Sequence, residues 1–277
     1  MPNRPDSLRG RTIVMSGGSR GIGLAILVAV AQRGANAVLL AKTDRPDPRL
    51  PGTVHTAVAE IERAGGRAVA VVGDVRSETD VERAADVAAS TFGGVDIVIN
   101  NASALHTRGT AEVTSKRFDL MQSVNSRGTF LLTRACLPHL RRAHDGQILT
   151  LSPPINLDPG WLGAFPPYML SKYGMSLLTL GWAAELADHG IRANCLWPQT
   201  TIATAAVVNL LGGQEATSRA RSPQIMADAA IAVLTDPSRP TGKTLLDEEA
   251  LASAGISDLT PYGGGERPEI DLFVGTR

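Results

Sequence analysis

The chain has 277 residues, of which 43% are hydrophobic and 19% are charged, an ordinary composition for a soluble globular protein. Lysine plus arginine and aspartate plus glutamate number 27 each, so the formal net charge is zero. A neutral chain has no long-range field to attract nucleic acid or an anionic membrane, and we expect neither as a partner.

Short β-branched runs alternate with longer helical patterns along the chain. The predicted strands are residues 12–16, 37–41, 68–72, 96–99, 147–152, 192–197 and 244–247. The predicted helices are residues 21–33, 54–64, 78–90, 115–123, 127–142, 167–188 and 223–234. Continuously apolar strands alternating with helices are typical of a parallel sheet covered on both faces. The sequence therefore predicts one α/β domain over residues 1–277, with a Rossmann-like, doubly wound parallel sheet of about seven strands. Its core covers about residues 8–247, and the Gly- and Pro-rich residues 248–277 are predicted to form an irregular tail.

A glycine-rich turn joins the first strand to the first helix, with the spacing Gly-x3-Gly-x-Gly. Glycines let a backbone turn tightly and approach a pyrophosphate, whose charge then faces the N-terminus of the helix. The predicted cofactor contacts in this turn are Gly17, Ser19, Arg20, Gly21, Ile22 and Gly23. The alternative is a tight strand-to-helix turn that binds nothing.

The end of the second strand selects between the two nicotinamide nucleotides. An acidic residue there hydrogen-bonds the adenosine ribose and repels a 2′-phosphate, but this sequence has Ala41-Lys42-Thr43. Lys42 and Arg20 therefore favour NADP(H) over NAD(H). Asp44 and Asp47 follow in the next loop and weaken that preference. Alternatively, both cations are solvated surface charges.

Further motifs appear in a fixed order: Asp74 after the third strand, Asn100-Asn101-Ala102 after the fourth, and Tyr168-x3-Lys172 in a later helix. Together with the glycine turn, this set resembles the short-chain dehydrogenase/reductase family. The resemblance implies that Asp74 and Val75 contact the adenine, that Asn101 and Ala102 lie beside the adenosine, and that Pro198 and Thr200 flank the nicotinamide.

Tyr168 and Lys172 are predicted to be the catalytic pair. Residues four apart are neighbours on one helix face. A free tyrosine has a pKa near ~10, too high for efficient proton transfer at neutral pH, and a nearby ammonium favours the phenolate. Tyr168 is therefore predicted to move the proton, while Lys172 lowers its pKa and also holds the nicotinamide ribose. The alternative is a half-buried surface pair.

Two further residues complete the predicted catalytic set. Asn125 matches the family's catalytic asparagine, which anchors a water in a proton relay; the alternative is a helix cap or kink residue, and both can hold. The family ends its fifth strand with two serines, of which the second polarises the carbonyl. Pro153 fills that slot here, and proline donates no hydrogen bond. Ser152, one position earlier, is the candidate replacement, and its role stays open.

Residues 41–43, 151–157, 171–176 and 196–200 resemble the hydroxysteroid dehydrogenase-like protein 2 branch of the family, here without its sterol-carrier domain. Animal members of that branch are peroxisomal, but residues 275–277 do not form a peroxisomal tripeptide. The N-terminus lacks the apolar region of a signal peptide, and the two cysteines are too few for a disulfide framework. We therefore expect a cytoplasmic protein.

The substrate pocket is expected to be largely apolar. Its predicted lining is Ala104, Leu105, Ile155, Leu157, Trp161, Leu162, Phe165 and residues 200–211. The sequence thus predicts an NADP(H)-dependent oxidoreductase acting on a lipophilic carbonyl or secondary alcohol, and the family resemblance suggests a homodimer or homotetramer. The five histidines lack metal-ligand spacing, so no metal is expected. The alternative function is a nucleotide-binding sensor or scaffold that catalyses nothing.

Overall fold

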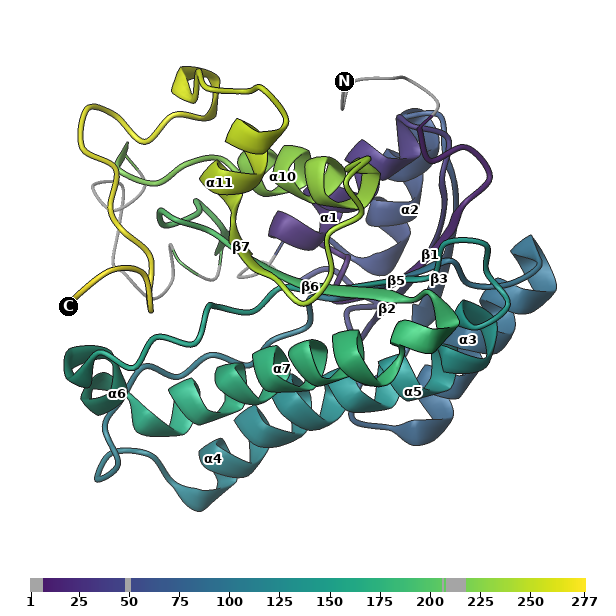
Figure 1. Cartoon of the computed structure of the whole chain (residues 1–277). Helices are drawn as coiled ribbons and strands as arrows, with labels where there is room; N and C mark the ends of the chain where they lie inside the picture. The colour runs from purple at the N-terminus through teal and green to yellow at the C-terminus, as the bar shows by residue number, and fades with distance from the viewer. Residues whose placement is uncertain (1–6, 48–50, 206, 208–217) are drawn as a thin grey trace.

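The computed structural model describes residues 7–47, 51–205, 207 and 218–277. Its centre is a seven-stranded parallel sheet in the order β3-β2-β1-β4-β5-β6-β7 (Figure 1). The strands are β1 (Thr12–Ser16), β2 (Asn36–Ala41), β3 (Arg67–Val72), β4 (Ile97–Asn100), β5 (Gln147–Thr150), β6 (Arg192–Trp197) and β7 (Thr244–Leu246). The strand order reverses between β1 and β4, and open α/β sheets bind ligands at the carboxyl ends of the strands beside such a point.

Helices cover both faces of the sheet (Figure 1). One layer contains α1 (Gly21–Ala31), α2 (Val54–Arg63), α10 (Gln224–Thr235) and α11 (Asp247–Ser253). The other contains α3 (Glu78–Phe92), α4 (Ser115–Gln122), α5 (Gly128–Leu140), α6 (Pro159–Ala164) and α7 (Pro166–Glu185). Ile13, Val14 and Met15 of β1 have no exposed surface, because layers pack on both sides of the central strand. The predicted doubly wound α/β fold is confirmed.

The structure differs from the predicted elements between α4 and α5. The two helices are joined by a π-helical turn, Ser123–Arg127, with no loop between them. Asn125 lies in this turn and is fully buried. Single π-turns inside α-helices often occur at functional sites, because the wider turn redirects one side chain.

The C-terminal residues are more ordered than the predicted irregular tail. Asp247, Glu248 and Glu249 form the first turn of α11, where acidic side chains complement the helix dipole. A short 3₁₀-helix, Thr260–Tyr262, follows. The chain then returns to the carboxyl edge of the sheet, where Thr200 and Ile270 form an antiparallel bridge. Within the described residues, no helix has the length and apolarity to cross a bilayer.

Candidate active site

A groove follows the carboxyl ends of β1 to β4. It is lined by all the glycine-turn residues predicted to contact a cofactor, and by Lys42, Asp74, Val75, Asn101 and Ala102. The structure therefore brings these separate sequence motifs to one place. Pro198 lines the adjoining cavity instead, and Thr200 is buried beside it without lining either space.

Gly17 and Gly23 have no room for a side chain. Asn101 Nδ2 donates to the backbone oxygens of Ser16 (3.0 Å) and Gly17 (2.8 Å). A Cβ on Gly23 would lie 2.6 Å from that nitrogen and 2.7 Å from the Gly17 oxygen. Gly17 also has a φ of 76°, which favours glycine. The α1 helix then begins without a side-chain cap or an acidic first turn, so its free N–H groups fit a phosphate group.

The end of the groove beside Lys42 and Asp74 carries more cations than anions. Asp74 accepts hydrogen bonds from the Arg76 guanidinium, the shortest 2.6 Å, which lower the pKa of Asp74 to about 2. Lys42 Nζ lies 3.7 Å from the same carboxylate. Arg20 donates to the Thr43 hydroxyl at 2.8 Å. Lys42 and Arg76 thus both pair with the Asp74 carboxylate, and Arg20 lines the same groove. Sequence reasoning had missed Arg76 because its contact arises from the turn after β3.

Asp44 does not join this group, because its carboxylate pairs with His55 at 2.7 Å.

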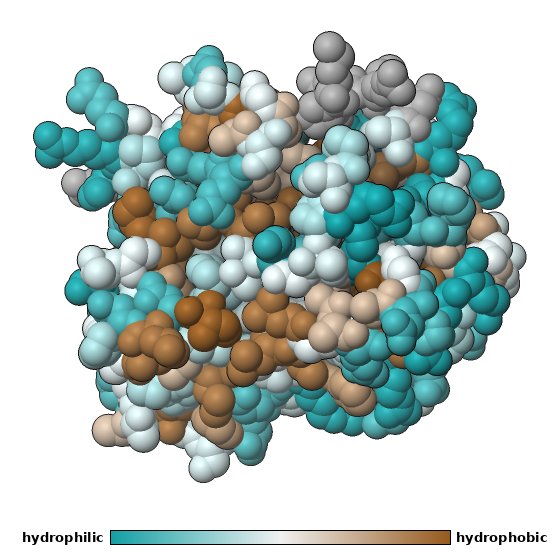
Figure 2. Space-filling view, in the orientation of Figure 1, coloured by the Kyte–Doolittle hydropathy of each residue, from teal (hydrophilic) through white to brown (hydrophobic). Residues whose placement is uncertain are grey.

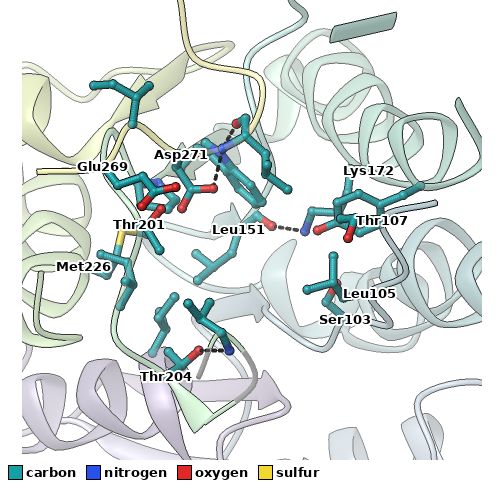
Figure 3. Close-up of a pocket in the computed structure, with 18 of the residues that line it drawn as sticks. Ser103, Leu105, Thr107, Leu151, Lys172, Thr201, Thr204, Met226, Glu269 and Asp271 are labelled. Carbon is teal, nitrogen blue, oxygen red and sulfur yellow. Dashed lines mark hydrogen bonds between the residues drawn. The ribbon is translucent and has the colours of Figure 1, made fainter. Parts of the chain in front are cut away.

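A second cavity of about 420 Å³ adjoins the groove (Figure 3). Ile22, Asn101, Ser103 and Thr204 line both spaces, so the two lie side by side. Tyr168 and Lys172 line the second cavity. A ligand in the groove can therefore meet a second molecule beside the tyrosine hydroxyl.

Tyr168 and Lys172 are both buried, on the first turns of α7. Lys172 Nζ donates to the Leu151 oxygen at 2.7 Å and lies 4.8 Å from the Trp197 ring centroid. Burial lowers the pKa of Lys172 to about 7. Burial, followed by the nearby Asp271 carboxyl, raises the pKa of Tyr168. The sequence argument expected the lysine to favour the phenolate, but desolvation dominates at this site and keeps the tyrosine protonated.

Asn125 holds the loop after β4 in place. Its side-chain oxygen accepts from the Ala104 N–H at 2.7 Å. Its amide nitrogen donates to the Ala104 oxygen at 3.0 Å and to the Ser171 hydroxyl at 2.8 Å. These bonds agree with the alternative that Asn125 is a helix kink residue, and they connect the π-helical turn to the cavity wall.

The structure does not bring Ser152 to the cavity. Ser152 is fully buried and lies against the Cys195 thiol, and Pro153 follows it. The hydroxyl near Tyr168 belongs to Ser103, which lines the cavity within hydrogen-bonding reach of the tyrosine. Sequence spacing along β5 could not reveal this, because Ser103 follows a different strand.

The C-terminal segment forms one wall of the cavity. Glu269, Ile270, Asp271 and Leu272 line it, and Figure 3 shows Glu269 and Asp271 on the side opposite Ser103 and Lys172. Burial raises the pKa of Asp271 to about 7. Sequence reasoning missed this wall. The apolar residues around Phe273 were the one sequence feature that could have indicated a buried segment here.

The predicted apolar lining is confirmed only in part. Leu105 and Phe165 line the cavity, as do Thr201, Ile202, Thr204 and Val207. Ala104 lines the groove. Ile155, Trp161 and Leu162 pack into the aromatic cluster behind the wall, and Leu157 is 69% exposed. Residues 206 and 208–211 lie outside the described residues.

The seven-stranded parallel sheet, with a groove at the carboxyl ends of its strands, defines a Rossmann-like α/β protein, and comparison with known families identifies which one. A family model described as short chain dehydrogenase matches residues 11–212. The chain belongs to the short-chain dehydrogenase/reductase family of oxidoreductases.

Within that family, the chain is similar to proteins called hydroxysteroid dehydrogenase-like protein 2. It is 47% identical to the Danio rerio protein over 255 residues, which cover 92% of this chain and 61% of that protein. It is 44% identical to the Homo sapiens protein, over 96% of this chain and 64% of that protein. The chain thus spans less than two thirds of the length of these relatives. A short chain dehydrogenase structure from Mycobacterium thermoresistibile is 52% identical, with a TM-score of 0.92, and covers 97% of this chain and 96% of that one.

Proposed function

We propose that the chain is an NADP(H)-dependent oxidoreductase that interconverts a lipophilic carbonyl compound and a secondary alcohol. The observation that carries the proposal is the position of Tyr168 and Lys172 in a cavity that adjoins the glycine-lined groove and shares four lining residues with it. The apolar side chains of Leu105, Phe165 and Ile202 in the cavity wall support a lipophilic substrate.

The groove residues would hold the nucleotide: the α1 N-terminus its pyrophosphate, and Lys42, Arg20 and Arg76 a 2′-phosphate. Cationic side chains recognise phosphate through charge-assisted hydrogen bonds. When bound, the nicotinamide nucleotide supplies or accepts the hydride.

Tyr168 carries the proton step. In the reducing direction its hydroxyl donates a proton to the substrate oxygen, and the raised pKa keeps that proton in place until charge develops on the oxygen. Lys172 has a pKa of about 7, so it can exchange a proton at neutral pH and restore the tyrosine. In the oxidising direction the same groups work in reverse.

We also propose a cytoplasmic homodimer or homotetramer. Figure 2 shows apolar surface over α7, where Leu170 and Leu177 are more than half exposed. Phe118 on α4 and Phe130 on α5 are exposed as well. The two cysteines are free thiols, which suits a reducing compartment.

The first test compares the melting-temperature shift given by NADPH with that given by NADH. A ligand at 100 times its dissociation constant adds about 2.7 kcal/mol of stability, or several degrees at roughly 2–4 °C per kcal/mol. We expect a larger shift with NADPH, followed by turnover of apolar ketones or aldehydes. No shift with either nucleotide contradicts the proposal.

A second candidate function is a nucleotide-binding sensor that catalyses nothing, favoured by the position of Ser152 outside the cavity. It predicts an NADPH shift with no turnover across a broad carbonyl and alcohol panel.

A further inference from the structure

The cavity receives no hydroxyl from the end of β5. Ser152 is fully buried against Cys195, and Pro153 follows it. The hydroxyl side chains that do line the cavity are Tyr168, Ser103, Thr107, Thr201 and Thr204. A second hydroxyl donor to a carbonyl substrate beside Tyr168 must therefore come from another part of the chain.

Ser103 is the hydroxyl placed beside Tyr168. It lies within hydrogen-bonding reach of the tyrosine hydroxyl, and this contact lowers the tyrosine pKa against the larger effect of burial. Ser103 also lines both the groove and the cavity, so it sits where the two spaces join. Thr201 lies on the opposite wall, next to Glu269 (Figure 3).

The backbone on both sides of Ser103 is fixed. Asn101 donates two hydrogen bonds to the end of β1 and the glycine turn. Asn125 exchanges two hydrogen bonds with the backbone of Ala104. Donors held before the reaction stabilise developing charge without a reorganisation cost, and this double anchoring gives the Ser103 hydroxyl that property.

We propose that Ser103, on the loop after β4, is the catalytic serine of this chain and donates a hydrogen bond to the substrate oxygen beside Tyr168. The inference deepens the proposed reductase function and rests on it. In reduction, the carbonyl carbon takes a hydride from the reduced nicotinamide nucleotide and the C=O π bond breaks. The oxygen takes the Tyr168 proton, and Ser103 keeps its own proton while its hydrogen bond stabilises the developing alkoxide.

The experiment compares Ser103→Ala, Ser103→Thr and Ser152→Ala with the wild type. The control for loss of a surface hydroxyl is Ser90→Ala, at an exposed position of α3. For Ser103→Ala we expect a fall in kcat of roughly 100-fold, as for the loss of one preorganised donor. The NADPH-induced melting shift should equal that of the wild type, and Ser103→Thr should recover most of the rate.

The pH profile gives a readout that a structural role would not change. Because the Ser103 contact lowers the pKa of Tyr168, its loss should move the acidic limb of alcohol oxidation, where protonation of Tyr168 removes the base, to higher pH.

Three results would overturn the inference and leave the reductase function standing. The first is an unchanged kcat in Ser103→Ala, and the second is a loss of kcat in Ser152→Ala instead. The third is a loss of kcat in Ser103→Ala together with a smaller NADPH melting shift, which would make Ser103 a nucleotide ligand. A wild type that binds NADPH yet turns over no substrate would overturn the reductase function, and this inference with it.

Discussion

The Phe273 ring packs against the Tyr168 ring, with centroids 6.0 Å apart. Phe273 has no exposed surface, and it also contacts the rings of Trp161, Tyr173 and Trp197. Its φ is 68°, a conformation that a bulky side chain seldom adopts and that costs on the order of 1 kcal/mol or more. Burial of the ring offsets that strain, so the C-terminal segment is fastened to the helix that carries Tyr168 and Lys172.

Phe273→Ala should therefore destabilise the protein and disturb the cavity wall. Removing a fully buried phenylalanine costs about 3–5 kcal/mol, which urea unfolding would measure. The control is Leu157→Ala, at a position that is 69% exposed, where we expect a change within about 0.5 kcal/mol. Equal effects in the two variants would mean that the C-terminal segment does not hold the wall.

Tyr168→Phe should abolish catalysis without loss of the nucleotide. We expect kcat to fall by roughly 10²–10⁴-fold, the usual contribution of a positioned proton donor, with an unchanged NADPH melting shift. The matched control is Tyr173→Phe on the same helix, because the Tyr173 hydroxyl donates to the Asn156 oxygen at 2.6 Å and does not line the cavity. A Tyr168→Phe variant as fast as the wild type would assign the proton step to another group.

Lys42→Ala should weaken NADPH binding selectively. Lys42 is 61% exposed and lies 3.7 Å from Asp74, so removing it also leaves that carboxylate less well neutralised. We expect a roughly 10-fold loss in NADPH affinity, equivalent to ~1.4 kcal/mol, and little change for NADH. Calorimetric titration measures the affinity for each nucleotide. The control is Lys116→Ala, at an exposed position of α4. An equal loss for the two nucleotides would remove Lys42 from the selection of the 2′-phosphate.

Asp271→Asn should flatten the dependence of stability on pH between about 4 and 7. Burial raises the pKa of Asp271 to about 7, and Asp247, Glu269 and Lys172 act on it as well. An unfolded aspartate has a pKa near ~3.9, so the folded state binds this proton more tightly. The stability that it contributes is present below pH ~4 and is lost as the pH rises through the folded pKa.

For the wild type we expect Asp271 to account for a loss on the order of 4 kcal/mol across that window, measured by urea unfolding at successive pH values. Asparagine keeps an oxygen for the Leu272 N–H, which donates to Asp271 at 2.6 Å. Burial of Lys172 acts in the opposite sense and above pH 7, because its pKa is lowered to about 7. A variant curve parallel to the wild type between pH 4 and 7 would show that Asp271 is ionised throughout.

The sequence by itself determined the features that depend on short stretches of chain. The β1 strand was predicted with its observed bounds, Thr12–Ser16, because a run buried on both faces is apolar throughout. The glycine spacing marked the turn at which α1 begins, and the four-residue spacing of Tyr168 and Lys172 put both on one helix face. These patterns are enough to define the doubly wound sheet and the family.

Only the tertiary structure decided which side chains meet. Ser103 follows β4 and Ser152 follows β5, and local sequence favoured the second, but the pairing of the strands and the π-helical turn at Asn125 bring the first to Tyr168. Asp271 and Phe273 lie in a stretch with weak local signals. The Phe273 ring packs among aromatic residues from α6, α7 and β6, and this packing brings Asp271 to the cavity wall. Local propensity fixes strands and helices, whereas such contacts depend on chain segments that are distant in sequence and become neighbours only when the core packs.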